Sequence, residues 1–289
     1  MWRLYLALAE LTYPPVLCYH RIGGPPELGV TRVGRSVFAR QMTALARGGW
    51  RTLTLDEFAN ARPTHDGRRT FLLTFDDGYA ALAEHAYPVL ADLGFTATTF
   101  LITDFVGKAN TWDVRYTWDR LSHLGWAQIE HWRARGFDFG SHGATHRRLT
   151  WLADDAVQVD LDRSREVLRA RLGAEAARAL AYPFGAVDSR IVLRAAAAGF
   201  EVGFGGVKAT GERLNLARVP VYLWDLWDVP FGLRDDGLGS VGRFVAHVAN
   251  RCAVGTSIMQ GVWFRVSGVR PDTRHLTPET RRRISQRLG

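Results

Sequence analysis

The sequence is poor in cysteine and has no long hydrophobic run. Cys18 and Cys252 are its only two cysteines; they do not make a disulfide framework and have no metal-ligand spacing. No apolar stretch is long enough to cross a bilayer. The apolar start, residues 2–11, is short, is interrupted by Glu10, and lacks a basic segment and a small-residue cleavage site. We therefore expect a protein that is cytoplasmic or peripheral to the membrane, with a weak interfacial anchor at most.

Lysine is also scarce, although the chain is basic. Only Lys108 and Lys208 are lysines among 37 basic residues, and the formal net charge is +8. Such an excess can favour nucleic acid, an anionic membrane or a phosphorylated substrate, or can simply follow from a GC-rich genome. The arginines are dispersed apart from the run 281–283, and no zinc finger or stacking motif accompanies them. We therefore predict no nucleic-acid partner.

No glycine-rich phosphate loop follows any predicted strand, which argues against a nucleotide-binding fold. Instead, strands alternate with helices over about two hundred residues, a pattern that requires a parallel sheet with crossover helices. We predict strands at residues 15–19, 50–53, 71–75, 96–102, 137–141, 178–182, 200–204 and 218–223. Helices are expected near residues 36–48, 54–60, 79–93, 124–135, 157–172 and 188–198. Ser36, Thr54 and Asp188 are the predicted caps, and Pro88 is expected to kink its helix.

The chemically active residues come directly after these strands: His20, Asp76, His142 and Pro183. Because active sites gather at this end of closed β/α barrels, we predict an α/β fold with a barrel-like closure rather than an open doubly wound sheet. Residues 1–223 would form the barrel domain. Residues 224–289, with one predicted helix at 241–252, would be a basic appendage packed on the same domain.

The most informative stretch is Thr74–Tyr79, in which a buried strand ends in two adjacent acids, Asp76 and Asp77. Like charges this close repel each other unless a cation, a donor or a proton lies between them. A solvated Asp-Asp-Gly turn would be the ordinary interpretation of an isolated match.

A second stretch, His142–His146, places two histidines four residues apart. If the chain turns helically after the strand, both imidazoles lie on one face and can share an ion. Asp77 or Asp76 could supply a third ligand from a strand that neighbours the His142 strand. A divalent ion such as Zn²⁺ would then lower the pKa of a bound water toward ~7. The remaining aspartate could accept the proton of that attacking water.

Hydrolysis also needs an oxyanion stabiliser and an acid for the leaving group. The backbone N–H of Tyr79 is a candidate for the first role. His20, at the tip of the first strand, is a candidate for the second, although it could equally be a hydrogen-bonded loop residue. The other histidines, His123 among them, are expected to be solvated.

Three motifs resemble those of the polysaccharide deacetylases (carbohydrate esterase family 4): Thr74–Tyr79, His142–His146 and Tyr182–Gly185. Their order and spacing follow the family from about Pro15 to about Leu223. The resemblance implies a distorted (β/α) barrel with parallel strands and a divalent metal, usually zinc. It also implies release of acetate from an N-acetylated amino sugar by a metal-bound water.

The resemblance also implies the role of each matching residue. Asp76 would be the catalytic base, and Asp77, His142 and His146 would be the metal ligands. Pro183 belongs to the third motif, which in the family begins with an arginine two residues before the proline. That position is Ala181 here, so either another group orients Asp76 or activity suffers; Arg218 is our hypothesis for the substitute.

The late Leu-x-His motif of the family has no good match after Gly185. However, Pro15–His20 resembles the start of the poly-N-acetylglucosamine deacetylase branch, in which the corresponding histidine lies near the beginning of the domain. That branch also tolerates loss of the motif arginine. The resemblance therefore makes His20 the general acid.

The expected substrate is an N-acetylated glycan or glycoconjugate, and a lipid-linked or small-molecule amino sugar is the alternative within the same chemistry. Trp112, in an aromatic segment at residues 103–122, could stack on a sugar ring or pack on the barrel rim. Loss of the motif arginine favours another hypothesis, a catalytically inactive carbohydrate-binding relative. Oligomeric state is not predicted.

Overall fold

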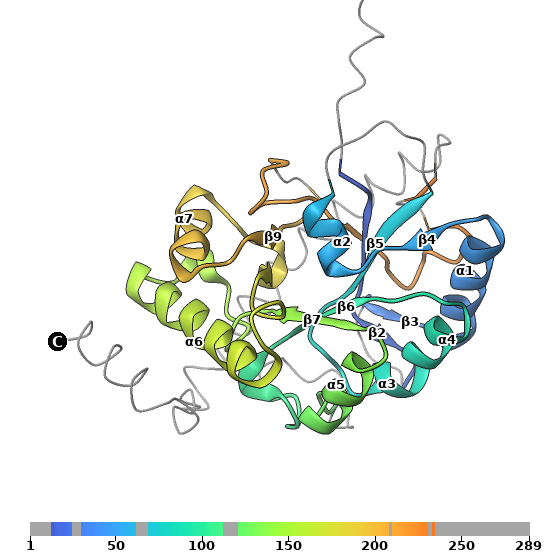
Figure 1. Ribbon diagram of the computed structural model, residues 1–289, viewed down its shortest axis with the longest axis horizontal. Helices are drawn as coiled ribbons and strands as arrows, with labels where there is room; N and C mark the ends of the chain where they lie inside the picture. The colour runs from blue at the N-terminus through green and yellow to red at the C-terminus, as the bar shows by residue number, and fades with distance from the viewer. Residues whose placement is uncertain are drawn as a thin grey trace, which may run out of the picture.

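A curled sheet of parallel strands forms the centre of the structure (Figure 1), a computed structural model that describes residues 13–24, 30–61, 69–111, 121–207, 210–230 and 233–234. The strands lie in the order β10-β1-β5-β6-β7-β8-β9, and β4 pairs with β5 outside this path. Each of these pairs is parallel. The strands are β1 (Val16–Tyr19), β4 (Arg51–Thr52), β5 (Thr70–Phe75), β6 (Thr98–Leu101), β7 (Asp138–Ser141), β8 (Ala179–Ala181), β9 (Val202–Phe204) and β10 (Val219–Pro220), with a separate pair β2 (Arg21–Ile22) and β3 (Arg32–Val33).

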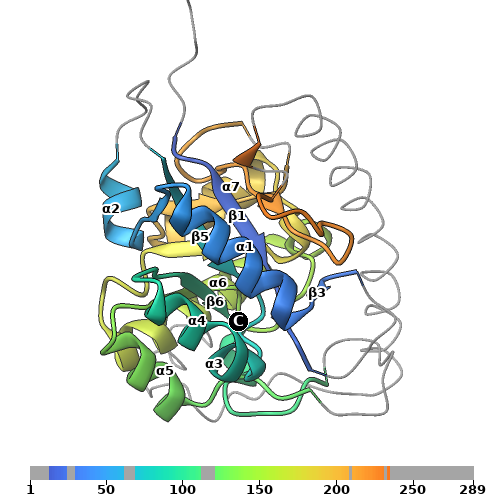
Figure 2. The same cartoon turned by 90° about the vertical axis from the view of Figure 1, so that its right-hand side faces the viewer.

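Helices connect successive strands and cover the outside of the sheet, as the pattern predicted. They are α1 (Arg35–Arg47), α2 (Leu55–Asn60), α3 (Ala81–His85), α4 (Tyr87–Asp92), α5 (Trp126–Arg133), α6 (Asp154–Leu172) and α7 (Ser189–Ala198), with 3-10 turns η1 (Thr103–Phe105), η2 (Leu149–Trp151) and η3 (Pro183–Gly185). In the view turned by 90°, α1 lies across β1 and β5 (Figure 2). No helix in the described ranges is long and apolar enough to cross a membrane.

One segment joins the two edges of the curled sheet. Leu216 forms an isolated parallel bridge with Phe204 on β9, and three residues later Val219 pairs with Leu17 on β1. The chain thus passes from one edge to the other, and Arg218 lies at the crossing. The prediction of a distorted (β/α) barrel is confirmed.

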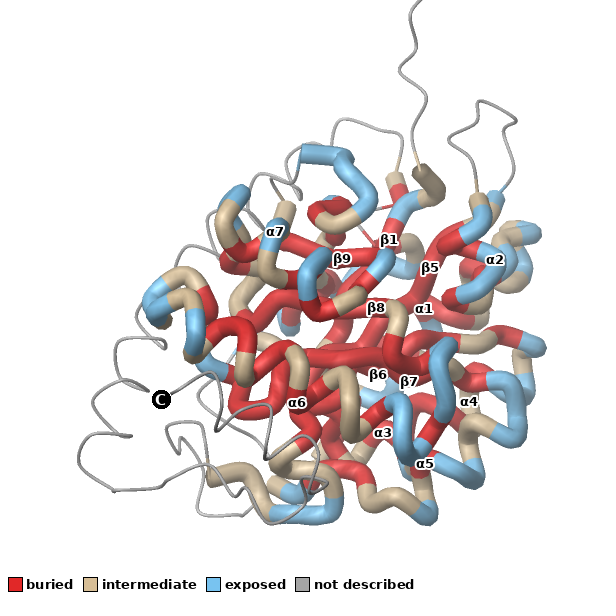
Figure 3. The backbone as a smooth tube through the Cα atoms, turned by 60° about the vertical axis from the view of Figure 1, so that its left-hand side comes forward, coloured by how far each residue is buried: buried red, intermediate tan, exposed pale blue. Residues whose placement is uncertain are grey.

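Alternate strand residues divide into two cores, because successive side chains of a strand point to opposite faces. Leu17 and Leu73 belong to the cluster that contains residues of α1, α3 and α4. Val16, Leu72 and Phe100 belong to a second cluster that also contains residues of β8, β9 and α2. The strands are accordingly buried on both sides, whereas the outer faces of the helices are exposed (Figure 3).

Helix α2 closes the N-terminal end of the barrel. Thr54 and Glu57 form the predicted capping box, in which the Thr54 side chain accepts from Glu57 N and the Glu57 carboxylate accepts from Thr54 N. Leu55 N donates to Asp138 Oδ2 at the start of β7, at 2.6 Å. This end of the barrel is therefore sealed by packing, and the opposite end remains for chemistry.

Two helix predictions were wrong in detail. Helix α1 begins at Arg35 after Gly34, and no side chain caps it, so Ser36 is not the cap. The helix expected at 79–93 is divided into α3 and α4 at Ala86. Pro88 lies in the first turn of α4, where its missing N–H breaks no intrahelical hydrogen bond, so it helps to start a helix rather than kinking one.

Most of the predicted appendage lies outside the described residues, including the helix expected at 241–252. The described residues that follow β10 pack against α1: Gln41 Nε2 donates to Asp225 O at 2.8 Å and lies 3.1 Å from Trp227 O. Leu233 is buried in the larger core cluster. Trp112, the predicted sugar-stacking residue, also lies outside the described residues.

Candidate active site

The candidate residues gather at the C-terminal ends of the barrel strands. His20 follows β1, Asp76 and Asp77 follow β5, and His142 follows β7. β1 and β5 pair directly, but β6 lies between β5 and β7. The expectation that the Asp77 and His142 strands are neighbours was therefore wrong. The curl of the sheet brings these strand ends together across β6.

Asp77, His142 and His146 converge on one point. Asp77 Oδ1 lies 3.2 Å from Nε2 of His146 and 3.5 Å from Nε2 of His142. One ligand atom from each of the three residues lies within 4.8 Å of the others, and all three residues are buried. The structure thus brings together the three residues predicted to bind a metal.

The His142–His146 segment is a loop rather than the helical turn that the spacing suggested. Gly143 and His146 have positive φ angles of 75° and 56°, which turn the chain back so that the two rings lie 4.8 Å apart. The buried carboxylate of Asp160 on α6 secures this loop by accepting from Ala144 N at 2.8 Å and from Thr145 Oγ1 at 2.6 Å. Sequence reasoning missed Asp160. The sequence carried one indication of its burial: Asp160 precedes Leu161, which belongs to the apolar face of the predicted helix at 157–172.

The tautomer of His142 is fixed by its other nitrogen. Nδ1 lies 2.8 Å from the carbonyl oxygen of Ala181, so Nδ1–H donates there. Burial lowers the pKa of His142 to about 4, so near neutral pH the ring is uncharged and Nε2 carries a lone pair.

This lone pair faces another acceptor, because Asp77 is ionised. Burial raises the pKa of Asp77, but the adjoining imidazoles, His146 first among them, outweigh burial and lower the pKa to about 2. Asp77 Oδ1 is buried and accepts no hydrogen bond of normal geometry from the described residues. Acceptors directed at one point repel each other unless a cation lies between them, so this donor set fits a divalent metal.

Asp76 has a different environment. Arg218 donates from Nη1 to Oδ1 and from Nη2 to Oδ2 of Asp76, both at 2.7 Å, and both side chains are buried. Burial raises the pKa of Asp76, but the Arg218 guanidinium outweighs burial and holds the pKa well below its usual range. The group that faces the carboxylate is therefore the arginine that the sequence suggested in place of Ala181.

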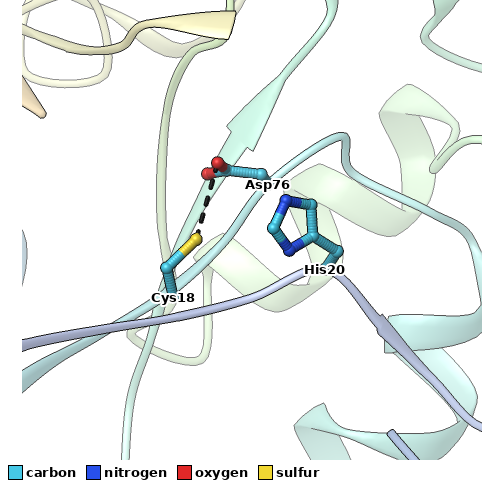
Figure 4. Close-up of side chains that lie close together, drawn as sticks. All are labelled: Cys18, His20 and Asp76. Carbon is cyan, nitrogen blue, oxygen red and sulfur yellow. Dashed lines mark hydrogen bonds between the residues drawn. The ribbon is translucent and has the colours of Figure 1, made fainter. Parts of the chain in front are cut away.

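His20 and Cys18 also lie next to Asp76 (Figure 4). Cys18 Sγ donates to Asp76 Oδ2 at 3.5 Å. His20, Cys18 and Asp76 form a second group whose ligand atoms lie within 4.8 Å of one another. The ring of His20 therefore reaches the carboxylate beside which it was predicted to act.

Tyr79 and His123 line the segment that follows Asp77. The Tyr79 ring stacks on the His123 ring with a centroid distance of 5.2 Å, and His123 Nδ1 lies 2.8 Å from Asp77 O. The expectation that His123 is solvated was wrong, since only 4% of it is exposed. Burial lowers the pKa of His123 to about 4, so it is neutral and donates to the Asp77 carbonyl, which helps to hold Asp77 at its positive φ of 67°.

Pro183 is buried in η3, directly after β8. The next residue, Phe184, has a positive φ of 61° and packs on His146 with a ring-centroid distance of 4.7 Å. The third motif thus borders the Asp77–His142–His146 cluster.

Comparisons with known proteins find sequences similar to this chain. Residues 64–203 match the family model of the polysaccharide deacetylases. A Bacillus subtilis protein, YxkH, whose name assigns it to the polysaccharide deacetylases, is 28% identical over 192 residues, or 65% of this chain and 63% of that protein. The poly-beta-1,6-N-acetyl-D-glucosamine N-deacetylase of Staphylococcus epidermidis is 26% identical over 195 residues, 63% of this chain and 64% of that protein. The matches therefore span a little under two thirds of the length of these relatives.

A solved structure supports the fold. The deacetylase PplD of Streptococcus pyogenes superimposes with a TM-score of 0.63 at 21% identity, covering 73% of this chain and 93% of that chain. The protein is thus a parallel (β/α) barrel with carboxylates and imidazoles at the C-terminal ends of its strands. Residues 64–203, just under half of the chain, are thus similar to the polysaccharide deacetylases, and the two relatives agree with that similarity. The family is metal-dependent, and Asp77, His142 and His146 provide a fitting site.

Proposed function

We propose that this protein hydrolyses the N-acetyl group of an amino sugar in a polysaccharide or glycoconjugate, releasing acetate. The observation that carries the proposal is the convergence of Asp77 Oδ1 with Nε2 of His142 and His146 beside a second, arginine-held carboxylate. Asp77, His142 and His146 would hold the divalent ion, for which Zn²⁺ is our first choice. When bound, the ion would supply Lewis acidity to the acetamide oxygen and to the attacking water.

Asp76 acts as the general base. Its carboxylate is ionised at all working pH values because Arg218 faces both oxygens, so it can accept a proton from water. The same contact fixes the carboxylate plane, because a guanidinium pairs with a carboxylate through two parallel hydrogen bonds. In this proposal Arg218 takes over the orienting role that a motif arginine at position 181 would have.

His20 acts as the general acid that protonates the leaving amine nitrogen. Its Nδ1 is buried and makes no hydrogen bond within the described part of the chain, so the ring is not committed to a structural partner. The backbone N–H of Tyr79 stabilises the oxyanion, since it follows Asp77 by two residues at the same strand end. Pro183 shapes the wall beside His146.

The substrate is proposed as an N-acetylated glycan of the poly-N-acetylglucosamine kind. Its support is the Staphylococcus epidermidis relative, which is named for that polymer, together with Pro15–His20. A lipid-linked amino sugar remains the alternative, with a peripheral membrane contact suggested by the net charge of +8. An inactive carbohydrate-binding relative is the second candidate function, and the alanine at position 181 is the feature that favours it.

The test is acetate release from N-acetylated oligosaccharides and lipid-linked amino sugars, measured with and without a chelator. We expect acetate from one substrate class, loss of release after chelation, and recovery with Zn²⁺. Binding of oligosaccharides without acetate release under any metal would favour the inactive relative.

A further inference from the structure

A second cluster of metal-binding side chains includes Asp76 and shares none of the three residues of the Asp77–His142–His146 cluster. It consists of the Cys18 thiol, the His20 imidazole and the Asp76 carboxylate. β1 and β5 pair in parallel with Cys18 opposite Thr74 and Tyr19 opposite Phe75, so the three groups emerge side by side at two adjacent strand ends. Figure 4 shows the thiol and the imidazole on the same segment, both close to the Asp76 carboxylate, with the thiol hydrogen-bonded to it.

The spacing of these atoms suits a single ion. Cys18 Sγ lies 3.5 Å from Asp76 Oδ2. Sulfur at about 2.3 Å and oxygen at about 2.0 Å from a tetrahedral Zn²⁺ would lie about 3.5 Å apart. His20 Nδ1 is buried and unpartnered within the described ranges, which leaves an imidazole nitrogen for the third position. Thiolate, imidazole and carboxylate are the three ligand types that zinc uses in proteins.

The reaction proposed above has no use for a thiol at this place. In the absence of an ion, burial raises the pKa of Cys18, and this effect exceeds the lowering by the charge of Arg218. Cys18 is therefore a protonated thiol, which donates to Asp76. A thiophilic cation would replace that proton, releasing it to solvent. Neither His142 nor His146 has a sulfur neighbour of this kind among the described residues.

Arg218 determines the order in which the two sites fill. Its guanidinium lies 2.7 Å from both oxygens of Asp76 and would repel a cation there. Asp77 instead contacts the imidazoles of His142 and His146, while the Arg218 guanidinium is hydrogen-bonded to Asp76. The Cys18 cluster is therefore the weaker of the two sites and fills only when metal exceeds one equivalent.

We propose that Cys18, His20 and Asp76 form a second, inhibitory site for a thiophilic divalent cation such as Zn²⁺ or Cd²⁺. Occupation would engage the carboxylate and the imidazole on which hydrolysis depends. The inhibitory consequence rests on the proposed function, whereas the binding itself does not.

Binding is tested with Co²⁺, because a thiolate–cobalt bond gives a charge-transfer band in the near ultraviolet. The full-length metal-free protein is titrated with Co²⁺ to several equivalents. We expect the band to develop after the first equivalent in the wild type and in Cys252→Ser, and to be missing in Cys18→Ser and Cys18→Ala. A wild type without the band at excess Co²⁺, or a Cys18→Ser variant that retains it, would overturn the proposal. Circular dichroism of each variant establishes that it is folded.

Inhibition is tested separately by acetate release in a Zn²⁺ titration. The wild type should gain activity with the first equivalent and lose it at excess Zn²⁺. Cys18→Ser should keep the gain, because serine retains a donor to Asp76, and its half-inhibitory Zn²⁺ concentration should rise by at least about tenfold. Equal inhibition of both proteins would refute an inhibitory role for this site. If no acetate is released by any protein, the proposed function fails, while the cobalt band still decides whether the site exists.

Discussion

Asp76 and Asp77 are adjacent in sequence and equally buried, yet they are neutralised in opposite ways. The charge of Asp76 is met by Arg218 through two hydrogen bonds of 2.7 Å, so its counter-cation is part of the chain. Asp77 faces Nε2 of His142 at 3.5 Å and Nε2 of His146 at 3.2 Å, and of these rings His142 is neutral. The comparison teaches that two identical side chains acquire different chemistry from their neighbours: one is a permanent carboxylate base, and the other needs a cation from outside.

The sharpest test of this comparison substitutes each aspartate in turn. Asp76→Asn should reduce acetate release by about 10⁴, at the upper end of what a general base contributes, while the bound metal stays near wild-type content. Asp77→Asn should lose the metal as well as the activity. Metal content by elemental analysis and acetate release separate the two variants. Loss of metal from Asp76→Asn instead would mean that the two roles have been exchanged.

Removing the imidazole on the Asp76 side should have the next largest effect. His20→Ala is expected to slow acetate release by about 10²–10³ without changing the stoichiometry of one metal per chain, because His20 supplies a proton rather than a ligand at the first site. His131→Ala, on the surface of α5, is the matched control and should retain full activity. An unchanged rate in His20→Ala would transfer the acid role to another group.

Arg218→Ala should remove the cation that neutralises Asp76. It leaves a buried carboxylate without its cation, so we expect a loss of about 3–5 kcal/mol in the free energy of unfolding. Since the carboxylate is also no longer oriented, activity should fall by about 10–100-fold. Chemical denaturation measures the first effect, and acetate release at a temperature where the variant is folded measures the second.

A double variant tests whether an arginine at position 181, where the third motif of the family has one, can replace Arg218. Ala181→Arg in the Arg218→Ala background should recover part of the activity if the two arginines are alternative ways to orient Asp76. The single variant Ala181→Arg serves as the control for overpacking, because Ala181 is fully buried. A double variant no more active than Arg218→Ala would show that position 181 cannot serve Asp76 in this barrel.

The strands of the main sheet, their order of appearance and the residues at their tips were accessible from the sequence, because buried strands leave local patterns, whereas the short pair β2–β3 was not. Contacts between distant segments were not. The Asp160 carboxylate on α6 holds the histidine loop after β7, and its place beside the apolar face of the helix does not reveal which loop it contacts. The loop itself depends on a positive φ at His146. Because residues other than glycine rarely adopt a positive φ, the sequence does not predict this turn. The i,i+4 spacing thus gave the correct pair of histidines for a wrong geometric reason.

Arg218 shows both the reach and the limit of such reasoning. It lies 142 positions from Asp76 in sequence, so only the missing arginine at 181 pointed to it. The fold gives the physical reason for its position. Arg218 lies where the chain crosses from the β9 edge to the β1 edge, and from there its side chain reaches Asp76 at the end of β5, the neighbour of β1. The neutral state of His123 had no sequence signal, because its burial depends on stacking with Tyr79.

The smallest expected effect concerns the histidines around Asp77. It is a dependence of the free energy of unfolding on pH. His142 and His123 both have a pKa lowered to about 4 by burial, against an ordinary value of 6.5. Between these values the unfolded chain takes up protons that the folded protein does not. Their contribution is therefore complete above pH 6.5 and is lost as the pH falls toward 4. The lowered pKa values of Asp76 and Asp77 continue the loss at lower pH.

For the chelator-treated protein we expect each histidine to account for a loss on the order of 1–3 kcal/mol between pH 7 and pH 4.5, or about 2–4 °C in Tm per kcal/mol. The measurement is thermal unfolding across this range. His123→Asn should flatten the curve by about half, because one of the two neutral imidazoles is gone. A wild-type Tm that stays level down to pH 4.5 would mean that the rings around Asp77 are already charged in the folded state, and Asp77, like Asp76, would then have its counter-cation within the chain.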